Sequence, residues 1–392
     1  MCFPASDAWY FPHDGYYLAS MPLDVFRQVF SLSLAANRVN NILGGQASLQ
    51  KRLQDILTSE IPKIGADWQL VWGPAVFKTN PEDPQSCPEN SWYVAFHPHL
   101  RFEDDSVHPT YVIAIAGTPR RSIRVWLKED LAVNAVVDFK TWVDGGIQKA
   151  PAVQRRFVSW IRKGTYIASG TVTAVHKLFT TPAPAGAESV GSTLLDYITK
   201  QDKSTSHRII VTGHSLGGVL APSLALALLL NRSILADRIL SYPIAGPSPG
   251  NKRFAELFAK NMPPRKSDGA ASYQGWNLNL VNQLDVVPQA WCISSRASKN
   301  QNLGNIPTLY GKPAMNVVRV TTWVAKFWSV FSGVLYKPLP AQYFKGTTPP
   351  AAPATVGEFE DVVQQQHWKS YFKEVGIPLP SPEKDEVVPD SK

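Results

Sequence analysis

Residues 208–218 read Arg208-Ile-Ile-Val-Thr-Gly213-His214-Ser215-Leu216-Gly217-Gly218, and an almost wholly apolar stretch follows as far as Leu230. The opening residues have the β-branched, apolar composition of a short buried strand. The stretch from Leu216 has the length and apolarity of a helix packed against a sheet. Glycines at 213 and 217 suit a sharp turn, because larger side chains would clash there. We therefore predict a strand–turn–helix unit that exposes the hydroxyl of Ser215.

Strand and helix patterns alternate on both sides of this unit. Apolar or alternating runs bounded by turn residues predict strands at 69–78, 92–97, 111–116, 238–245 and 276–282. Helical periodicity predicts helices at 23–36, 49–57, 164–179, 189–200, 252–261 and 356–375. This order indicates an α/β fold with a mostly parallel central sheet flanked by helices. The Pro-rich run 337–353 is typical of a linker.

Composition narrows the class of protein. The 392 residues are 44% hydrophobic and 18% charged, which favours one or two globular domains with a sizeable core and excludes a disordered or fibrous chain. Cys2, Cys87 and Cys292 have neither a disulfide-framework pattern nor metal-ligand spacing, so we expect no metal and no cofactor. The net charge of +8 comes from scattered residues and short pairs, so we expect no nucleic-acid partner.

The chain shows no obvious targeting or membrane-spanning segment. Its first residues lack a basic region followed by an apolar run, so we expect a cytoplasmic or other intracellular location, with secretion left open. The most apolar candidate span, 316–336, is interrupted by Arg319 and Lys326. We expect no transmembrane helix and a monomeric protein.

A serine hydroxyl is a poor nucleophile until a base takes its proton and a carboxylate orients that base. In α/β-hydrolases the chain order is Ser, then Asp or Glu, then His. Of the eight histidines only His367 follows Ser215. His214 adjoins the serine, but neighbouring side chains diverge at a turn, so we expect a structural role for it. His367 is therefore the predicted base.

Several carboxylates lie between the serine and this histidine. Asp285 follows a predicted strand and precedes Val286-Val287-Pro288, where a strand gives way to a loop at the carboxyl edge of the sheet. That edge is the usual place for such sites, so Asp285 is preferred and Asp237 is the best alternative. The other candidates are Glu256, Asp268, Glu358, Glu360 and Asp361.

Four stretches together resemble the class 3 lipase family, the fungal-type triacylglycerol lipases with an α/β-hydrolase fold. They are Ile113–Thr118 with the Trp-bearing segment 122–131, Gly213–Gly218, Ala245–Asn251 with Asn282–Pro288, and His367–Tyr371. The resemblance implies Ser215 as nucleophile, His367 as base and Asp285 as orienter. It also implies an oxyanion hole built from Thr118 and the backbone N–H of Leu216. Ala116 departs from the Arg that the family usually has before Gly117.

The resemblance further implies a lid at about 119–134. Ile123, Trp126 and Leu127 share one helical face, which could cover the site and turn toward lipid on opening, although a plain core helix would give the same pattern. We predict an N-terminal helical cap at 1–65, a catalytic domain at 66–375 with an insertion at about 292–355, and a disordered tail at 376–392. The insertion repeats a stripe of apolar residues at helical spacing, with Trp323 and Trp328 alongside: Val317, Val320, Val324, Phe327, Phe331 and Val334. This stripe is more typical of a cap that packs over the site than of an interfacial membrane anchor.

These features together predict a serine carboxyl-ester hydrolase that cleaves lipid or acylglycerol esters at a lipid–water interface through an acyl-enzyme. An acyltransferase or a short-chain esterase would use the same residues, and both stay open. A non-catalytic lipid-binding protein is the remaining alternative, which the presence of all three side-chain types disfavours. Peripheral contact with a membrane is an open expectation.

Overall fold

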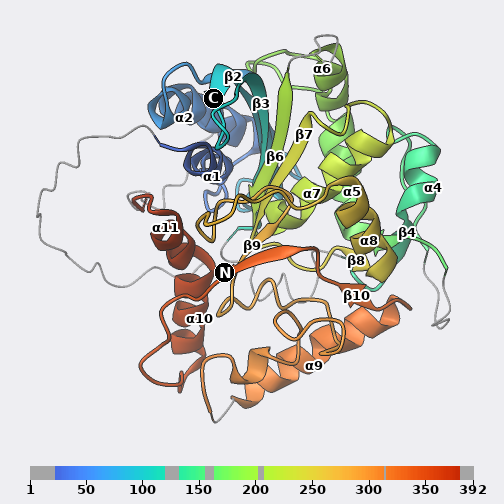
Figure 1. The fold of residues 1–392 in the computed structure, drawn as a ribbon, viewed down its shortest axis with the longest axis vertical. Helices are drawn as coiled ribbons and strands as arrows, with labels where there is room; N and C mark the ends of the chain where they lie inside the picture. Colours follow the sequence, from blue (N-terminus) through green and yellow to red (C-terminus); the bar gives the residue numbers. More distant parts are fainter. Residues whose placement is uncertain (1–22, 120–131, 155–162, 202–206, 313–314, 380–392) are drawn as a thin grey trace, which may run out of the picture.

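The computed structural model describes residues 23–119, 132–154, 163–201, 207–312 and 315–379. Within these residues seven strands form one sheet in the order β1-β2-β3-β6-β7-β9-β11 (Figure 1). Their bounds are β1 Gln69–Phe77, β2 Asn90–Arg101, β3 Val107–Ile115, β6 Arg208–His214, β7 Ile239–Ile244, β9 Asn279–Asn282 and β11 Ala341–Phe344. The five strands predicted around the Ser215 unit are all present.

The directions of the strands determine which edge of the sheet is expected to carry the functional site. The pairs β1–β2 and β2–β3 are antiparallel. From β3 onward, through β6, β7 and β9 to β11, each pairing is parallel. The carboxyl ends of the parallel strands therefore meet at the same edge, which is where α/β folds of this kind place their sites. This confirms the predicted α/β fold with a mostly parallel sheet.

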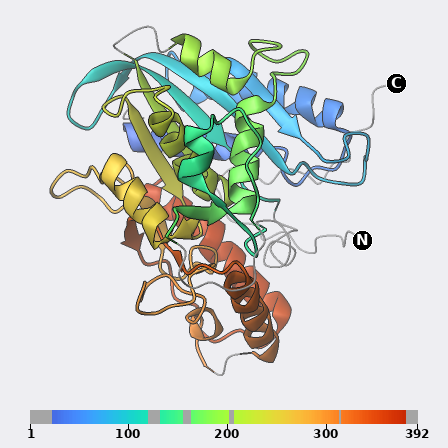
Figure 2. The same cartoon turned by 90° about the vertical axis from the view of Figure 1, so that its right-hand side faces the viewer.

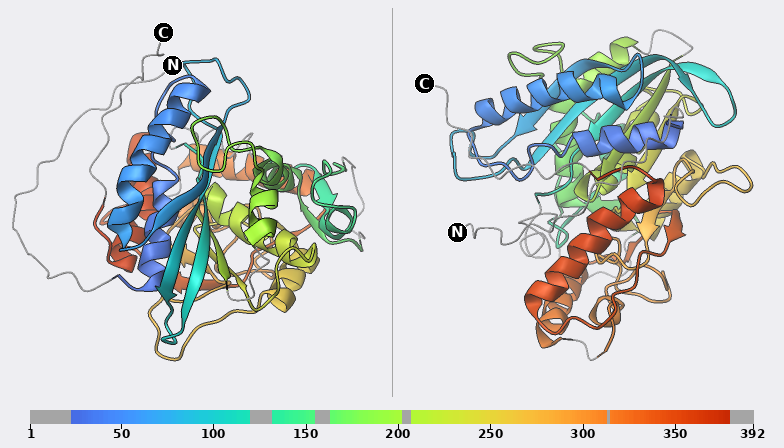
Figure 3. Two further views of the ribbon diagram at one scale, coloured as in Figure 1. Left: turned by 90° about the horizontal axis from the view of Figure 1, so that it is seen from above. Right: turned by 90° about the vertical axis from the view of Figure 1, so that its left-hand side faces the viewer.

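Helices cover both faces of the sheet (Figure 3). One face carries α1 (Val25–Ala35), α2 (Gln46–Ile64) and α11 (Ser370–Val375). On that face Phe26 stacks on Trp276, with ring centroids 4.4 Å apart, and lies against Tyr242. The other face carries α4 (Phe139–Asp144), α5 (Ser169–Thr180), α6 (Leu194–Gln201), α7 (Leu216–Leu230) and α8 (Lys252–Asn261).

The position of helix α7 explains why its sequence is almost wholly apolar. It contacts β6 and β7 on one side and α5 and α8 on the other, and every residue from Leu216 to Leu228 is buried. A helix surrounded by protein has no water-facing side, so it needs no polar stripe. The predicted strand–turn–helix unit at residues 208–230 is confirmed.

A small second sheet, and the last strand of the main one, were not predicted. Strands β4 (Val136–Asp138), β5 (Tyr166–Ala168), β8 (Gly250–Asn251) and β10 (Tyr336–Lys337) form the small sheet. The linker expected at 337–353 is wrong over 341–344, because β11 pairs there with Asn279–Asn282. Only four residues long and bordered by prolines, β11 carries too little pattern to be recognised without its partner.

The C-terminal part of the described chain lies beyond the carboxyl edge of the sheet (Figures 1 and 2). It contains the one-turn helix Ile306–Thr308, α9 (Asn316–Phe331), α10 (Val356–Gln364) and a π-helical turn at Gln365–Lys369 that leads into α11. No helix among the described residues is long and apolar enough to span a membrane. The domain boundaries stay predictions. The lid residues Ile123, Trp126 and Leu127, and the tail from residue 380, lie outside the described residues.

Candidate active site

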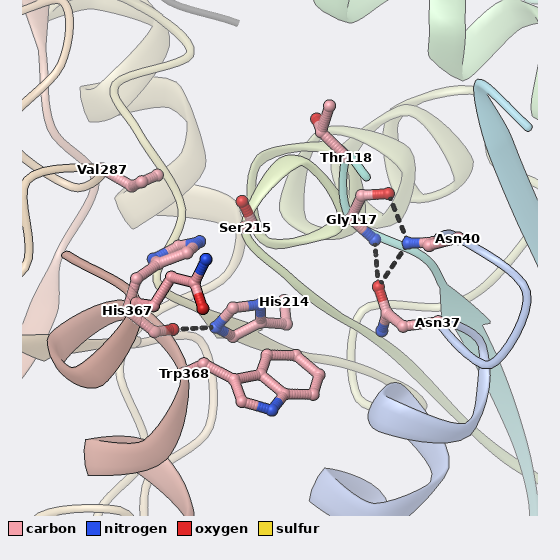
Figure 4. A pocket seen from close by; sticks show the side chains of 10 residues that line it. Asn37, Asn40, Gly117, Thr118, His214, Ser215, Val287, His367 and Trp368 are labelled. Carbon is pink, nitrogen blue, oxygen red and sulfur yellow. Dashed lines mark hydrogen bonds between the residues drawn. The ribbon is translucent and has the colours of Figure 1, made fainter. Parts of the chain in front are cut away.

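Ser215 sits at a strained turn between β6 and α7. Its φ of 61° and ψ of −117° place it in a conformation that side chains rarely adopt. The turn is tight because Gly213 and Gly217 meet face to face: a Cβ on Gly213 would lie 2.6 Å from the backbone of Gly217. The strain holds the Ser215 hydroxyl at the carboxyl edge of the sheet, in a cavity of about 50 Å³ (Figure 4).

Gly117 and Thr118 follow β3 and form the opposite wall of this cavity. A Cβ on Gly117 would lie 2.8 Å from the carbonyl oxygen of His214 and 3.1 Å from Ser215 Cβ, so only glycine fits between the ends of β3 and β6. Thr118 Oγ1 is buried and has no hydrogen-bond partner within the described part of the chain. It is thus an uncommitted donor beside the serine. The N–H of Leu216, in the first turn of α7, lacks an intrahelical acceptor by its position.

Two asparagines that sequence analysis missed hold this loop. Asn37 Oδ1 accepts the N–H of Gly117 at 2.7 Å, and Asn40 Nδ2 donates to the carbonyl oxygen of Gly117 at 2.9 Å (Figure 4). Asn40 also donates to Asn37, and Asn37 donates to Ser33 in α1. Both asparagines follow the end of α1, so the N-terminal layer fixes the backbone that precedes Thr118. No local signal in the sequence connects them to it.

His367 lies on the π-helical turn at Gln365–Lys369, and its ring faces Ser215 in the cavity (Figure 4). Its Nδ1 is 2.7 Å from Asp285 Oδ2 and is positioned to donate to that oxygen. In that tautomer Nε2 is left as an acceptor for the serine proton. The π-helical turn is a local widening of the helix that recurs at functional sites. The structure thus places Ser215, His367 and Asp285, predicted from chain order, around one site.

Asp285 is fully buried, and its carboxylate accepts hydrogen bonds from three groups. Besides the contact with His367, Oδ2 accepts the Tyr371 hydroxyl at 2.8 Å, and Oδ1 accepts the N–H of Val287 at 2.9 Å. Burial, and then the charge of Asp285, raise the pKa of Tyr371 well above its usual range. Tyr371 therefore stays protonated and donates to the carboxylate throughout the ordinary pH range. His367 Nδ1 contacts Asp285, and not the alternative carboxylate Asp237.

Two further side chains fix the turn that carries His367. His214 Nε2 lies 2.8 Å from the carbonyl oxygen of His367, so the residue beside the serine holds the backbone of the base. Asn282, at the end of β9, donates to the carbonyl and side chain of Gln366, and its N–H donates to the Tyr371 hydroxyl. This contact gives His214 the structural role that we expected for it. Asn282 joins the Asp285 loop to the same turn.

A larger cavity of about 690 Å³ adjoins the first one. Thr118 and Leu216 border it, together with the apolar side chains of Phe77, Trp92 and Leu178. Pro119 and Ala132, two described residues of the predicted lid segment, also border it. This cavity has mixed apolar and polar walls and reaches Thr118 and Leu216, the predicted oxyanion donors, so it has a position suited to an acyl chain.

No cluster of three or more His, Cys, Asp or Glu side chains among the described residues could hold a metal ion. The expectation that the reaction needs neither metal nor cofactor stays a prediction.

Comparison with known proteins gives this site its context. The family model described as Lipase (class 3) matches residues 112–294. The crystal structure of M37 lipase superposes with a TM-score of 0.65 at 21% identity, covering 91% of this chain and 96% of that chain. A comparison with curated proteins finds no significant match.

More distant likenesses are to the propeptide complex of Rhizomucor miehei lipase and to the LIP2 lipase of Yarrowia lipolytica. The first has a TM-score of 0.39 at 18% identity, over 67% of this chain and 60% of that chain. The second has a TM-score of 0.40 at 16% identity, over 67% of this chain and 73% of that chain. At these scores neither contributes to the argument.

The α/β-hydrolase fold is thus shared with M37 lipase. The match to the class 3 lipase model indicates a serine hydrolase that acts on lipid esters. Over residues 112–294 the chain is similar to the class 3 lipase family. The matched range contains Ser215, Thr118 and Asp285, whereas Asn37, Asn40 and His367 lie outside it. The expected family resemblance is confirmed.

Proposed function

We propose that the protein hydrolyses carboxyl esters of lipids through an acyl-enzyme on Ser215, with His367 as general base and acid and Asp285 as orienter. The observation that carries this proposal is the hydrogen bond from His367 Nδ1 to the buried Asp285, with Ser215 on the same cavity. That bond fixes the tautomer whose Nε2 can take the serine proton.

The reaction has two stages. Ser215 Oγ attacks the ester carbonyl as its proton passes to His367 Nε2, and the negative charge on the tetrahedral oxygen is stabilised by the Leu216 N–H and by Thr118. Collapse breaks the ester bond, and the departing alcohol takes the proton from His367. Water then gives a proton to His367 and attacks the acyl-enzyme, which releases the fatty acid and restores Ser215.

The proposed substrate is an ester with an apolar acyl chain, presented at a lipid–water interface. The cavity bordered by Thr118, Phe77, Trp92 and Leu178 supports this, because it reaches the proposed oxyanion donors and the larger part of its wall is apolar. A short-chain ester would leave this space filled with water and would gain no hydrophobic contribution to binding.

A fluorophosphonate probe, followed by mapping of the adduct and assays with p-nitrophenyl esters from acetyl to palmitoyl, tests the proposal. We expect labelling at Ser215, loss of labelling in Ser215→Ala, and higher kcat/KM on longer chains. His367→Ala should lower kcat by about 10⁶-fold while the protein stays folded. An unlabelled Ser215 would overturn the mechanism. Turnover confined to the shortest esters would replace the lipid substrate with a small soluble ester.

A further inference from the structure

Helix α9 exposes most of its large apolar side chains, although Trp328 packs partly against the core. The residues it buries are small or polar: Val318, Thr322, Ala325 and Ser329. The residues it exposes are large and apolar, namely Val317, Val320, Trp323, Phe327 and Val330. The packed-cap expectation for the stripe of Val317, Val320 and Phe327 is therefore wrong, because α9 packs through its opposite face.

The exposed face is aromatic at its centre. Trp323 is 65% exposed, Val320 60% and Phe327 43%. The Trp323 and Phe327 rings stack with centroids 5.8 Å apart, and Phe327 continues the cluster to Phe331 at 4.1 Å. A contiguous apolar face of this kind marks an interaction surface, whereas single exposed apolar residues are ordinary.

The orientation of α9 is set by specific contacts on its inner face. Ser329 Oγ donates to the carbonyl oxygen of Trp291 at 2.7 Å, and Ala325 is fully buried. Trp291 lies on the chain that follows Asp285, so α9 is attached to the loop that leaves the candidate active site. Small side chains at this contact let the helix approach closely and leave the bulky ones facing outward.

The charged residues of α9 itself are all positive. Within Asn316–Phe331 the ionisable residues are Arg319 and Lys326, and the exposed Lys312 precedes the helix. Two copies of this surface would bring like charges together, which opposes self-association. An anionic lipid surface would instead be attracted, and tryptophan beside basic residues is typical of helices lying in the headgroup region.

We propose that α9 is the surface by which the protein docks on anionic lipid, with Val320, Trp323 and Phe327 entering the headgroup–acyl boundary and Arg319 and Lys326 contacting phosphates. Figures 1 and 2 show α9 beyond the carboxyl edge of the sheet, on the side of the candidate active site. Docking there would turn that side toward the lipid. The purpose of docking rests on the proposed function, but the binding itself needs no turnover.

The test uses the full chain with Ser215→Ala, so that binding is measured without hydrolysis. Flotation with phosphatidylcholine vesicles, with and without phosphatidylserine, should give stronger binding to the anionic vesicles. Trp323→Ser with Phe327→Ser should weaken binding about tenfold or more, because two exposed anchors are lost. The matched control is Leu235→Ser, which removes a side chain that is 61% exposed outside α9 and should leave binding unchanged.

A second variant separates charge from apolar insertion. Arg319→Glu with Lys326→Glu should reduce binding to anionic vesicles and leave binding to phosphatidylcholine little changed. Thermal unfolding confirms that each variant is folded. No binding by the parent protein, or equal binding by the Trp323 and Phe327 variant, would overturn the proposal. So would a change in oligomeric state, measured by light scattering, without a change in vesicle binding, because the face would then join two copies.

The outcome is independent of the catalytic proposal. If Ser215 fails to react with the fluorophosphonate while vesicle binding remains, the proposed function fails and the docking surface stands. The reverse pattern would leave a lipid esterase that does not use α9.

Discussion

The side chains of the candidate site reach it in two different ways. Ser215 and Asp285 are placed by their own turns, since the elbow forces φ to 61° and the N–H of Val287 holds the carboxylate two residues before it. Gly117, in contrast, is held from outside by Asn37 and Asn40. The class 3 lipase pattern usually has Arg before this glycine and the chain has Ala116. In this chain the side-chain amides of Asn37 and Asn40, from the N-terminal layer, hold the backbone there.

Asn37→Ala should lower kcat by about tenfold, because the Gly117 N–H loses its acceptor and the loop carrying Thr118 is less well positioned for the oxyanion. It should also lower the free energy of unfolding by about 1–3 kcal/mol, since a buried donor is left unpaired. Steady-state assays on a soluble short-chain ester measure kcat and KM separately, and KM should change little.

Asn231→Ala is the control for that variant, because Asn231 is a part-buried asparagine that donates to Ser233 away from the site. It should leave kcat at the parent value. If Asn37→Ala loses stability but keeps kcat, the clamp is purely structural and Thr118 does not depend on it.

At the scale of elements, helix α5 forms one wall of the larger cavity. Thr173, Ala174 and Lys177 line it on one helical face, while Leu178 reaches it from the buried side. Thr118 and Leu216, where the ester carbonyl would sit, border the same cavity. The length of acyl chain accepted would then depend on how much space α5 leaves.

Ala174→Trp should shorten the preferred acyl chain, because the indole would occupy the cavity that we assign to it. We expect kcat/KM on palmitoyl esters to fall about tenfold or more and that on acetyl or butyryl esters to change less than about twofold. The measurement is kcat/KM for the ester series, assayed with detergent above its critical micelle concentration. All esters are then presented in the same micelles, so differences at the interface do not contribute.

Ala259→Trp provides the matched comparison, since Ala259 lines a different surface pocket beside α8. It should leave the chain-length profile unchanged. Equal losses on short and long esters for Ala174→Trp would mean that the cavity does not hold the acyl chain.

At the scale of the whole molecule, α1 and α2 are one of the two layers that cover the sheet. Phe26, Phe30, Leu53 and Leu57 are fully or almost fully buried in the same core as Tyr242 of β7. A sheet buried on both faces needs both layers, because its strands are apolar on each side. The boundary expected near residue 65 thus crosses a continuous core.

A chain shortened to residues 66–392 should fail to reach the native state, because one face of the sheet would be exposed to water and the Gly117 clamp would be missing. We expect it to aggregate, or to bind the dye ANS strongly with weak near-ultraviolet circular dichroism. A cooperative thermal transition with retained esterase activity would contradict this. The N-terminal residues would then be a separable cap, as the sequence predicts.

The sequence alone determined the catalytic core: an apolar strand, the Gly-x-Ser-x-Gly turn and an apolar helix define a local unit, and one histidine after Ser215 left a single choice of base. Such features are local in the sequence or follow from chain order, so they can be predicted without knowing any tertiary contact. The tertiary structure decided what depends on distant partners. It joined Asn37 to Gly117, paired β11 with β9, and turned the aromatic stripe of α9 outward. Periodicity shows that a helix has an apolar face, but only the packing of its neighbours decides whether that face meets protein or solvent.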